Sequence, residues 1–117
     1  MDNETWVIEA GDLVIEKKAR VGIDGLTTWE RLVYSLWAAD YGMRNAGDLD
    51  TARDVYADFQ PDALRAADAL SLPATRGAFG LDPGVLEKRY FDLFEVICDE
   101  VRSAEQGVAG DRGPQLL

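Results

Sequence analysis

The chain contains no histidine and only one cysteine, Cys98, among its 117 residues. Zinc and copper sites are built mainly from histidine and cysteine, so their usual ligand sets are excluded. A serine or cysteine nucleophile normally depends on a nearby base, and the commonest base, histidine, is missing. A single cysteine cannot form a disulfide within the chain, so nothing in the sequence requires an oxidising compartment.

Long apolar runs are also missing, since none approaches the about 20 residues needed to cross a membrane. The first residues, Met1 to Glu4, are acidic where a secretory signal is basic. We therefore expect a cytoplasmic protein. A length of 117 residues suits one domain, and 47% apolar with 29% charged residues is typical of a folded globular chain.

Basic residues are few, 12 against 22 acidic ones, which gives a formal net charge of −10. The sequence pI is about 4.3. Nucleic acids and anionic membranes are polyanions, so direct binding to either is not expected. The charge favours a basic protein as the partner.

Glycine and proline divide the chain into segments with helical periodicity. The second helix should begin after a cap at Thr27 or Thr28 and stop between Gly42 and Gly47. The other expected helices span about 3–20, 49–59, 61–70 and 83–104, with a connecting loop at 73–84. Two short strands, 6–8 and 13–15, are an alternative for the first segment. We expect a single domain over residues 1–106 and a flexible tail over 107–117.

The second and last helices should each have a wide apolar face that includes aromatic side chains. The second carries Trp29, Leu32, Val33, Leu36, Trp37 and Tyr41, and the last carries Leu86, Tyr90, Leu93, Phe94, Ile97 and Val101. We predict an all-α fold, a compact helical bundle of about five helices with these two at its centre. A ligand cavity lined by the aromatic residues is the alternative. Tyr34, off the main stripe, is the aromatic residue expected to be most exposed, and Cys98 should be buried.

No motif for catalysis or cofactor binding is complete. Residues 48–50 begin like a calcium loop, but Ala52 and Arg53 stand where a ligand and a glycine are required. The glycine-rich segment 77–84 has neither the phosphate-loop lysine nor the dinucleotide-binding glycine spacing. Among 22 carboxylates some pair will fall at any chosen separation, so a glycosidase-like pair has no specific support. We predict no metal, no cofactor and no enzymatic activity.

Carboxylates recur at helical spacing in two rows. The first row, at intervals of four, is Asp50, Asp54 and Asp58, with Asp62 continuing it past Pro61. The second row, at i, i+3 and i+7, is Asp92, Glu95 and Asp99. Phosphates along a DNA strand repeat on a similar scale, so such rows could imitate a DNA backbone. The alternative is a solvated acidic face that only keeps the protein soluble.

Residues 26–34 read Leu-Thr-Thr-Trp-Glu-Arg-Leu-Val-Tyr, and residues 40–47, after Trp37, read Asp-Tyr-Gly-Met-Arg-Asn-Ala-Gly. This pattern resembles the DNA-mimic (DMP-type) family of small acidic helical bacterial proteins. Members have an aromatic-bearing helix that ends in an Asn-Gly-Gly-Phe-like turn, followed by short helices and an Ala-rich stretch, which residues 63–70 match. Asn45 and Gly47 match the turn, whereas Ala46 replaces its first glycine and Asp48-Leu49 stand at its aromatic position.

The resemblance covers about residues 26–80 and implies an acidic surface that occupies the DNA-binding face of another protein. Asn45 and Gly47 are expected to be structural, because both residue types tolerate left-handed backbone angles at helix ends. We therefore predict a non-enzymatic protein-binding domain whose acidic rows dock on a basic, DNA-binding protein. The second hypothesis is an immunity or antitoxin-type inhibitor of a basic nuclease. The sequence leaves open whether the chain forms a homodimer.

Overall fold

Six α-helices and one 3-10 turn make up the computed structural model, which describes the backbone of residues 1–115 and the side chains of residues 1–105. They are α1 (Asn3–Val21), η1 (Ile23–Gly25), α2 (Thr28–Ala46), α3 (Leu49–Val55), α4 (Phe59–Ala69), α5 (Pro73–Phe79) and α6 (Pro83–Gln115). No strand occurs within residues 1–115. The all-α prediction is confirmed, with six α-helices in place of about five, and the two-strand alternative is wrong.

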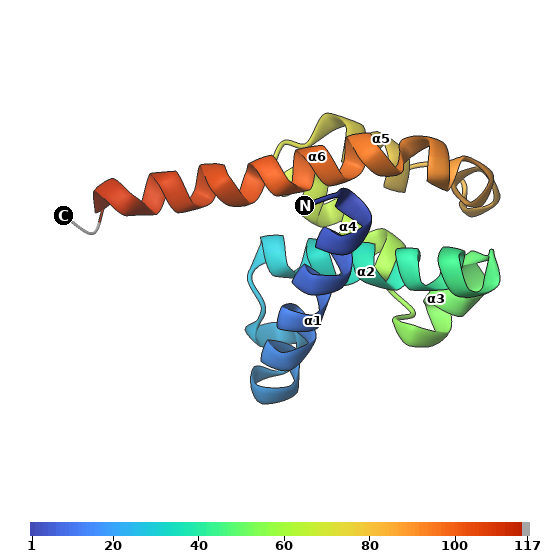
Figure 1. Ribbon diagram of the computed structural model, residues 1–117, viewed down its shortest axis with the longest axis horizontal. Helices are drawn as coiled ribbons and strands as arrows, with labels where there is room; N and C mark the ends of the chain where they lie inside the picture. Colours follow the sequence, from blue (N-terminus) through green and yellow to red (C-terminus); the bar gives the residue numbers. More distant parts are fainter. Residues whose placement is uncertain (116–117) are drawn as a thin grey trace.

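Helix α2 contacts four other helices, α1, α3, α4 and α6 (Figure 1). Helix α1 crosses it from the side nearest the viewer, while α6 runs above it and α5 lies between α4 and α6. The largest fully buried side chains come from α1, α2, α3, α4, α5 and α6 alike: Val7, Leu32, Val33, Leu36, Leu49, Phe59, Phe79, Leu86, Tyr90, Ile97 and Val101. One apolar core therefore unites all six helices.

Both ends of α2 form as the sequence predicts. The hydroxyl of Thr27 accepts from the backbone N–H of Glu30 at 3.1 Å, and the Glu30 carboxylate accepts from the N–H of Thr27 at 2.8 Å. This reciprocal capping box satisfies two amide donors that the first helical turn leaves unpaired. Gly47 ends the helix with φ of 73°, a left-handed angle that favours glycine. Asn45, expected in the turn, instead lies inside the helix, where its side-chain amide donates to the carbonyl of Tyr41, and only Gly47 of the two has a left-handed angle.

Helix α1 packs closely on α2 because Gly11 has no side chain. A Cβ atom at Gly11 would lie 2.3 Å from Cδ1 of Trp37. Further along the same pair, the Nζ of Lys17 lies 2.8 Å from the Glu30 carboxylate, and Lys18 lies over the ring of Tyr34. The interior glycine that weakens α1 as an isolated helix thus permits its contact with α2.

The predicted third helix over 49–59 is too long, because α3 ends at Val55 and α4 begins at Phe59. Tyr56 is extended, with φ of −149° and ψ of 100°, which breaks the helix. Pro61 is the third residue of α4 rather than the first. A proline is tolerated there because the first four amide groups of a helix have no partner within it.

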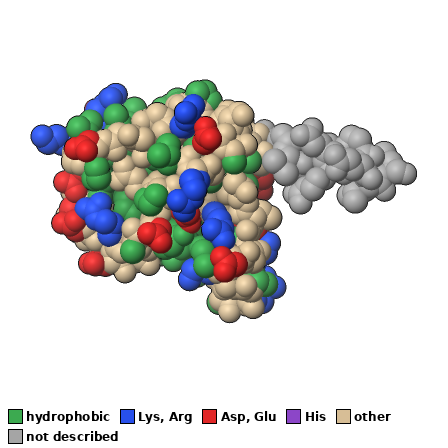
Figure 2. Space-filling model, turned by 180° about the vertical axis from the view of Figure 1, so that it is seen from behind, with side chains coloured by type: hydrophobic (Ala, Val, Ile, Leu, Met, Phe, Trp, Pro, Cys, Tyr) green, Lys and Arg blue, Asp and Glu red, His purple; other side chains and the backbone are tan. Residues whose placement is uncertain are grey.

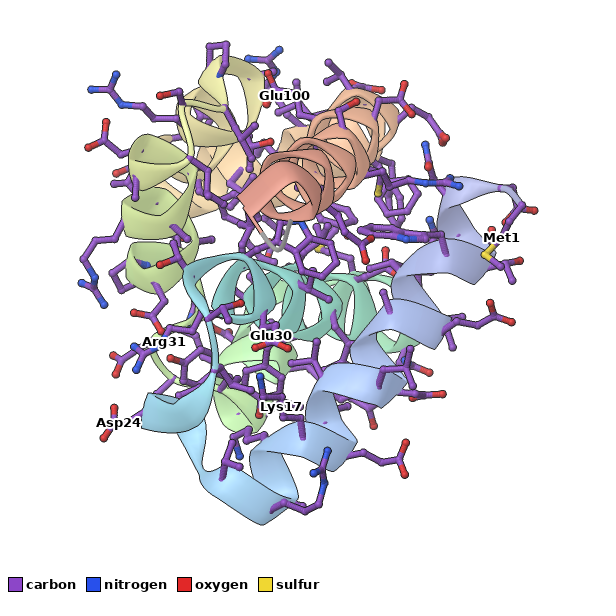
Figure 3. The ribbon with its side chains drawn as sticks, turned by 90° about the vertical axis from the view of Figure 1, so that its left-hand side faces the viewer. Met1, Lys17, Asp24, Glu30, Arg31 and Glu100 are labelled. Carbon is purple, nitrogen blue, oxygen red and sulfur yellow. The ribbon has the colours of Figure 1, made fainter. Side chains whose placement is uncertain are left out.

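The expected connecting loop over 73–84 is wrong, since it contains α5. Pro73 occupies the first turn of this short helix, a position that suits proline. The cap comes from α6, where the carboxylate of Glu100 accepts from the N–H of Ala74 at 2.9 Å and from the N–H and hydroxyl of Thr75 at 2.7 Å each. Figure 3 shows Glu100 at this junction.

The last helix is longer than predicted. The sequence suggests an end near Ala104, whereas the helical backbone of α6 continues to Gln115. The predicted flexibility of 107–117 concerns residues whose side chains lie outside the described part, and it stays a prediction. None of the helices in the described part is long and apolar enough to span a bilayer.

Candidate protein-binding surface

The aromatic side chains of α2 differ from the expectation at Tyr34 and at Tyr41, which was predicted on the apolar face that packs in the core but is 42% exposed. Tyr34, predicted to be the most exposed, is only 6% exposed, because the ring of Tyr56 packs against it at 4.9 Å and Lys18 covers it. Trp29 and Trp37 are half-buried, and the indole N–H of Trp29 donates to the carbonyl of Val101 at 2.8 Å. Most of these rings serve packing rather than a ligand.

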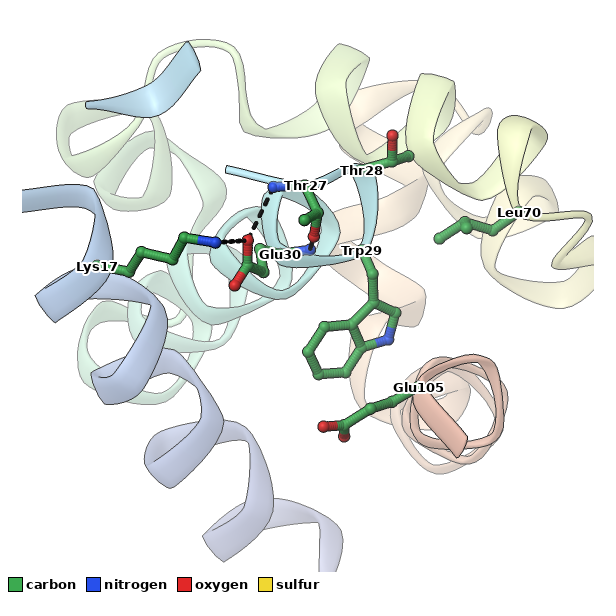
Figure 4. A pocket seen from close by; sticks show the side chains of 7 residues that line it. All are labelled: Lys17, Thr27, Thr28, Trp29, Glu30, Leu70 and Glu105. Carbon is green, nitrogen blue, oxygen red and sulfur yellow. Dashed lines mark hydrogen bonds and ion pairs between the residues drawn. The ribbon is translucent and has the colours of Figure 1, made fainter. Parts of the chain in front are cut away.

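A pocket of about 420 Å³ opens beside Trp29, between the start of α2 and α6 (Figure 4). Its lining residues are Lys17, Thr27, Thr28, Trp29, Glu30, Leu70 and Glu105. The polar groups of Lys17, Thr27 and Glu30 are already bonded to one another. A ligand site normally presents polar groups that are free to converge on the ligand. This pocket therefore gives weak support to a small-molecule site.

The first predicted row of carboxylates is not continuous. Asp50 and Asp54 are exposed on α3, and Asp50 pairs with Arg53. Asp58 is exposed too, but it lies after the end of α3, as the residue that precedes α4. The early end of α3 thus separates Asp58 from the other two carboxylates.

Asp62 is not part of an exposed face, which corrects the prediction. Its side chain is 5% exposed and accepts hydrogen bonds from the hydroxyl of Tyr56 and the guanidinium of Arg65, while Arg31 lies 3.9 Å away. Burial, followed by the bond to Asp62, raises the pKa of Tyr56, which therefore keeps its proton and donates it. Asp62 therefore links α4 to the turn that follows α3.

The second predicted row remains exposed as a unit. Asp92, Glu95 and Asp99 all face solvent on α6. The side-chain amide of Asn3 donates to Glu95 at 2.9 Å and to Asp99 at 3.1 Å. Asn3 is itself buried, and these two hydrogen bonds hold the first residue of α1 against the α6 row.

A third row, on α1, was missed by the sequence analysis. Glu9, Asp12 and Glu16 recur at i, i+3 and i+7 and are all exposed. Figure 3 shows oxygen-tipped side chains along the outer edge of α1. The spacing equals that of the α6 row, and no Lys or Arg precedes Lys17, so the signal is present in the sequence.

The carboxylates of the α1 and α6 rows form two regular series without ion pairs among residues 1–105. Several other acidic side chains do pair with cations, as in Asp24–Arg31, Glu30–Lys17, Asp40–Arg44, Asp50–Arg53, Asp62–Arg65 and Asp68–Arg76, whereas the exposed Asp54, Asp58 and Asp82 form no ion pair within residues 1–105. Among residues 1–105, none of the ion pairs uses a member of the α1 or α6 row. On the opposite side of the molecule, basic and acidic side chains are interspersed (Figure 2). Six of the exposed carboxylates without an ion pair among residues 1–105 therefore lie in regular series on α1 and α6.

Two ionisable side chains, Asp40 of α2 and Cys98 of α6, are buried. The Asp40 carboxylate accepts from the hydroxyl of Tyr90 at 2.7 Å and from Nε of Arg44 at 3.0 Å. Burial raises the pKa of Asp40, and its two donors oppose the rise. Burial, with the nearby charges of Asp40, Glu95 and Asp99, raises the pKa of Cys98 to about 12. Both groups are enclosed by packing, and no group of three potential metal ligands is present in the described part.

Cys98 should react with a thiol reagent only when the protein unfolds. Its side chain is fully buried, and a pKa raised from 9.0 to about 12 lowers the thiolate fraction at neutral pH about a thousandfold. We expect a chromogenic disulfide reagent to label the native protein at a negligible rate and the urea-unfolded protein within minutes. Rapid labelling of the native protein would contradict the placement of α6.

Comparison with known proteins identifies no relative: no family model, no curated protein and no solved structure matches the chain.

Proposed function

We propose that the protein is a non-enzymatic binding domain whose acidic surface, formed by the α1 row and the α6 row, docks on a basic protein in place of DNA. The observation that carries the proposal is the exposure of these six carboxylates without a cationic partner among residues 1–105. A surface that only served solubility would not need the contacts by which Asn3 holds Glu95 and Asp99 in place.

The spacing of the charges supports this proposal. Successive members of each row are three or four residues apart, so their Cβ atoms lie about 5–6 Å from each other. One amide group, that of Asn3, contacts both Glu95 and Asp99 and holds the two carboxylates together. A regular series of negative charges is what the cationic side chains of a DNA-binding protein recognise in the DNA backbone. Such charge also raises the rate of encounter with a basic partner.

Neutralising either row should weaken partner binding. The test variants are Glu9→Gln/Asp12→Asn/Glu16→Gln on α1 and Asp92→Asn/Glu95→Gln/Asp99→Asn on α6, which keep side-chain shape and the acceptors for Asn3. We expect each triple variant to bind the partner at least about tenfold more weakly at low salt, with a shallower dependence on salt. The partner is isolated from the native cell at low salt and then studied purified, by calorimetry and by competition with duplex DNA.

The matched control is Asp50→Asn/Asp54→Asn/Asp58→Asn, which changes net charge equally on exposed residues outside the surface. Equal losses from all three triple variants would show that only total charge matters, and the proposal would fail. A partner that binds the protein and duplex DNA simultaneously would exclude DNA mimicry. Inhibition of a nuclease through its active site, without competition from duplex DNA, would instead assign the immunity function.

A further inference from the structure

An exposed apolar patch adjoins the acidic surface where α1, α2 and α6 meet. Its centre is Arg44 of α2, whose guanidinium lies 5.2 Å from the ring centroid of Phe91 and 3.6 Å from the Glu4 carboxylate. Tyr41 lies one turn before Arg44 on the same helix, and Ile8 lies one turn after Glu4 on α1. We call Ile8, Tyr41 and Phe91 the Arg44 patch. These three side chains are 48%, 42% and 50% exposed.

The two rings of the Arg44 patch are held in place before any partner binds. Tyr41 stacks on Trp37 with centroids 5.6 Å apart, and Phe91 and Tyr90 form a T-shaped pair with centroids 5.2 Å apart. The charge of Arg44 is balanced by Asp40 and Glu4. Aromatic side chains that are already ordered lose little entropy on binding and often supply most of the affinity of an interface.

Carboxylates flank the Arg44 patch at one-turn spacing. On α1, Glu4 and Asp12 lie four residues before and after Ile8, and on α6, Glu95 lies four residues after Phe91. An apolar centre with a charged rim is the usual composition of a protein interface. Lys88, three residues before Phe91, also lies on this rim and Glu4 pairs with Arg44, so Asp12 and Glu95 are the rim charges that a cationic partner would neutralise and a second copy of the acidic chain would repel.

We infer that the Arg44 patch is the apolar anchor of the interface and that its occupant is a cationic amphipathic helix of a partner protein. Apolar side chains of that helix cover Tyr41 and Phe91, while its lysines or arginines reach Asp12 and Glu95 on either side. In this binding mode, an amphipathic helix is recognised through its apolar face, and charge pairs form on both sides of that face. The inference rests on the proposed function, and it adds that charge alone does not define the partner.

The test uses the full chain and two synthetic cationic peptides of equal length and equal lysine content. One peptide carries leucine at helical i, i+3, i+4 and i+7 spacing between its lysines, and the other carries serine at those positions. We expect calorimetry to show the leucine peptide binding about tenfold tighter to the wild-type protein. The variant Tyr41→Ala/Phe91→Ala should lose this preference and keep its affinity for the serine peptide. The control Leu13→Ala/Val21→Ala, which truncates exposed apolar residues elsewhere on α1, should keep the preference.

The outcomes separate the inference from the proposed function. Equal affinity of both peptides for the wild-type protein would overturn the inference and leave an acidic docking surface intact. Failure of both peptides to bind at low salt would remove the proposed function as well. A preference that survives in Tyr41→Ala/Phe91→Ala but disappears in the control would move the apolar anchor to Leu13. A wild-type dimer that this double variant dissociates would assign the patch to a second copy of the chain.

Discussion

Phe94→Ala should lower the free energy of unfolding by about 3–5 kcal/mol, a large part of the stability of a domain of this size. The Phe94 side chain is 4% exposed and packs against the ring of Tyr90 at 5.9 Å. The Arg44 guanidinium also lies 4.8 Å from its centroid. Truncation removes both contacts and leaves a cavity between α2 and α6. Urea denaturation monitored by circular dichroism measures the loss in the free energy of unfolding.

The neighbouring ring of Phe91 provides the control for Phe94. Because Phe91 is half exposed, Phe91→Ala should cost no more than about 1 kcal/mol. The two substitutions remove the same atoms from the same helix, so their difference reports burial. Similar losses from both, or a near-native stability of Phe94→Ala, would show that the packed face of α6 is misassigned.

Gly42→Ala should lower the free energy of unfolding by about 2–3 kcal/mol, although alanine is the better helix former. A Cβ atom at Gly42 would lie 2.7 Å from the backbone nitrogen of Ala52 and 2.8 Å from the carbonyl oxygen of Asp48. Backbone atoms cannot rotate aside, so α3 would have to move away from α2. Thermal and urea denaturation of the purified variant give the magnitude.

Gly77→Ala is the matched control for Gly42→Ala. Gly77 is also helical, in α5, but a Cβ atom there would meet nothing within 4 Å. The substitution should therefore stabilise the protein by up to about 1 kcal/mol through helix propensity alone. If both variants gain stability, the close approach of α2 and α3 at Gly42 does not exist.

Features that depend on neighbouring residues could be predicted from the sequence. The start of α2 follows from Thr27 and Glu30, which cap each other within three residues, and its end follows from Gly47. The burial of Cys98 follows from its place on the apolar face of α6. In each case the signal and the structure it specifies lie within one or two helical turns.

Features that depend on the path of the chain between helices, or on distant partners, could not be predicted. Asp62 belongs to a surface row by its spacing, yet the extended residue Tyr56 places a hydroxyl donor against it. Tyr34 is off the apolar stripe of its own helix, yet Tyr56 and α1 cover it. The α6 row is exposed as predicted, whereas its connection to α1 depends on Asn3, which lies 92 residues away from Glu95.

The cap that Glu100 supplies to α5 has a consequence for the order in which the chain folds. Helix α5 has only seven residues, and isolated helices of that length are marginal in water. The acceptor for its first amides is a carboxylate about 25 residues later in the chain. That carboxylate belongs to α6, which is synthesised after α5. Closing that loop costs entropy before the hydrogen bonds form. Helix α5 should therefore become persistent only once α6 has docked on it, and its amide protons should exchange with solvent whenever α6 detaches.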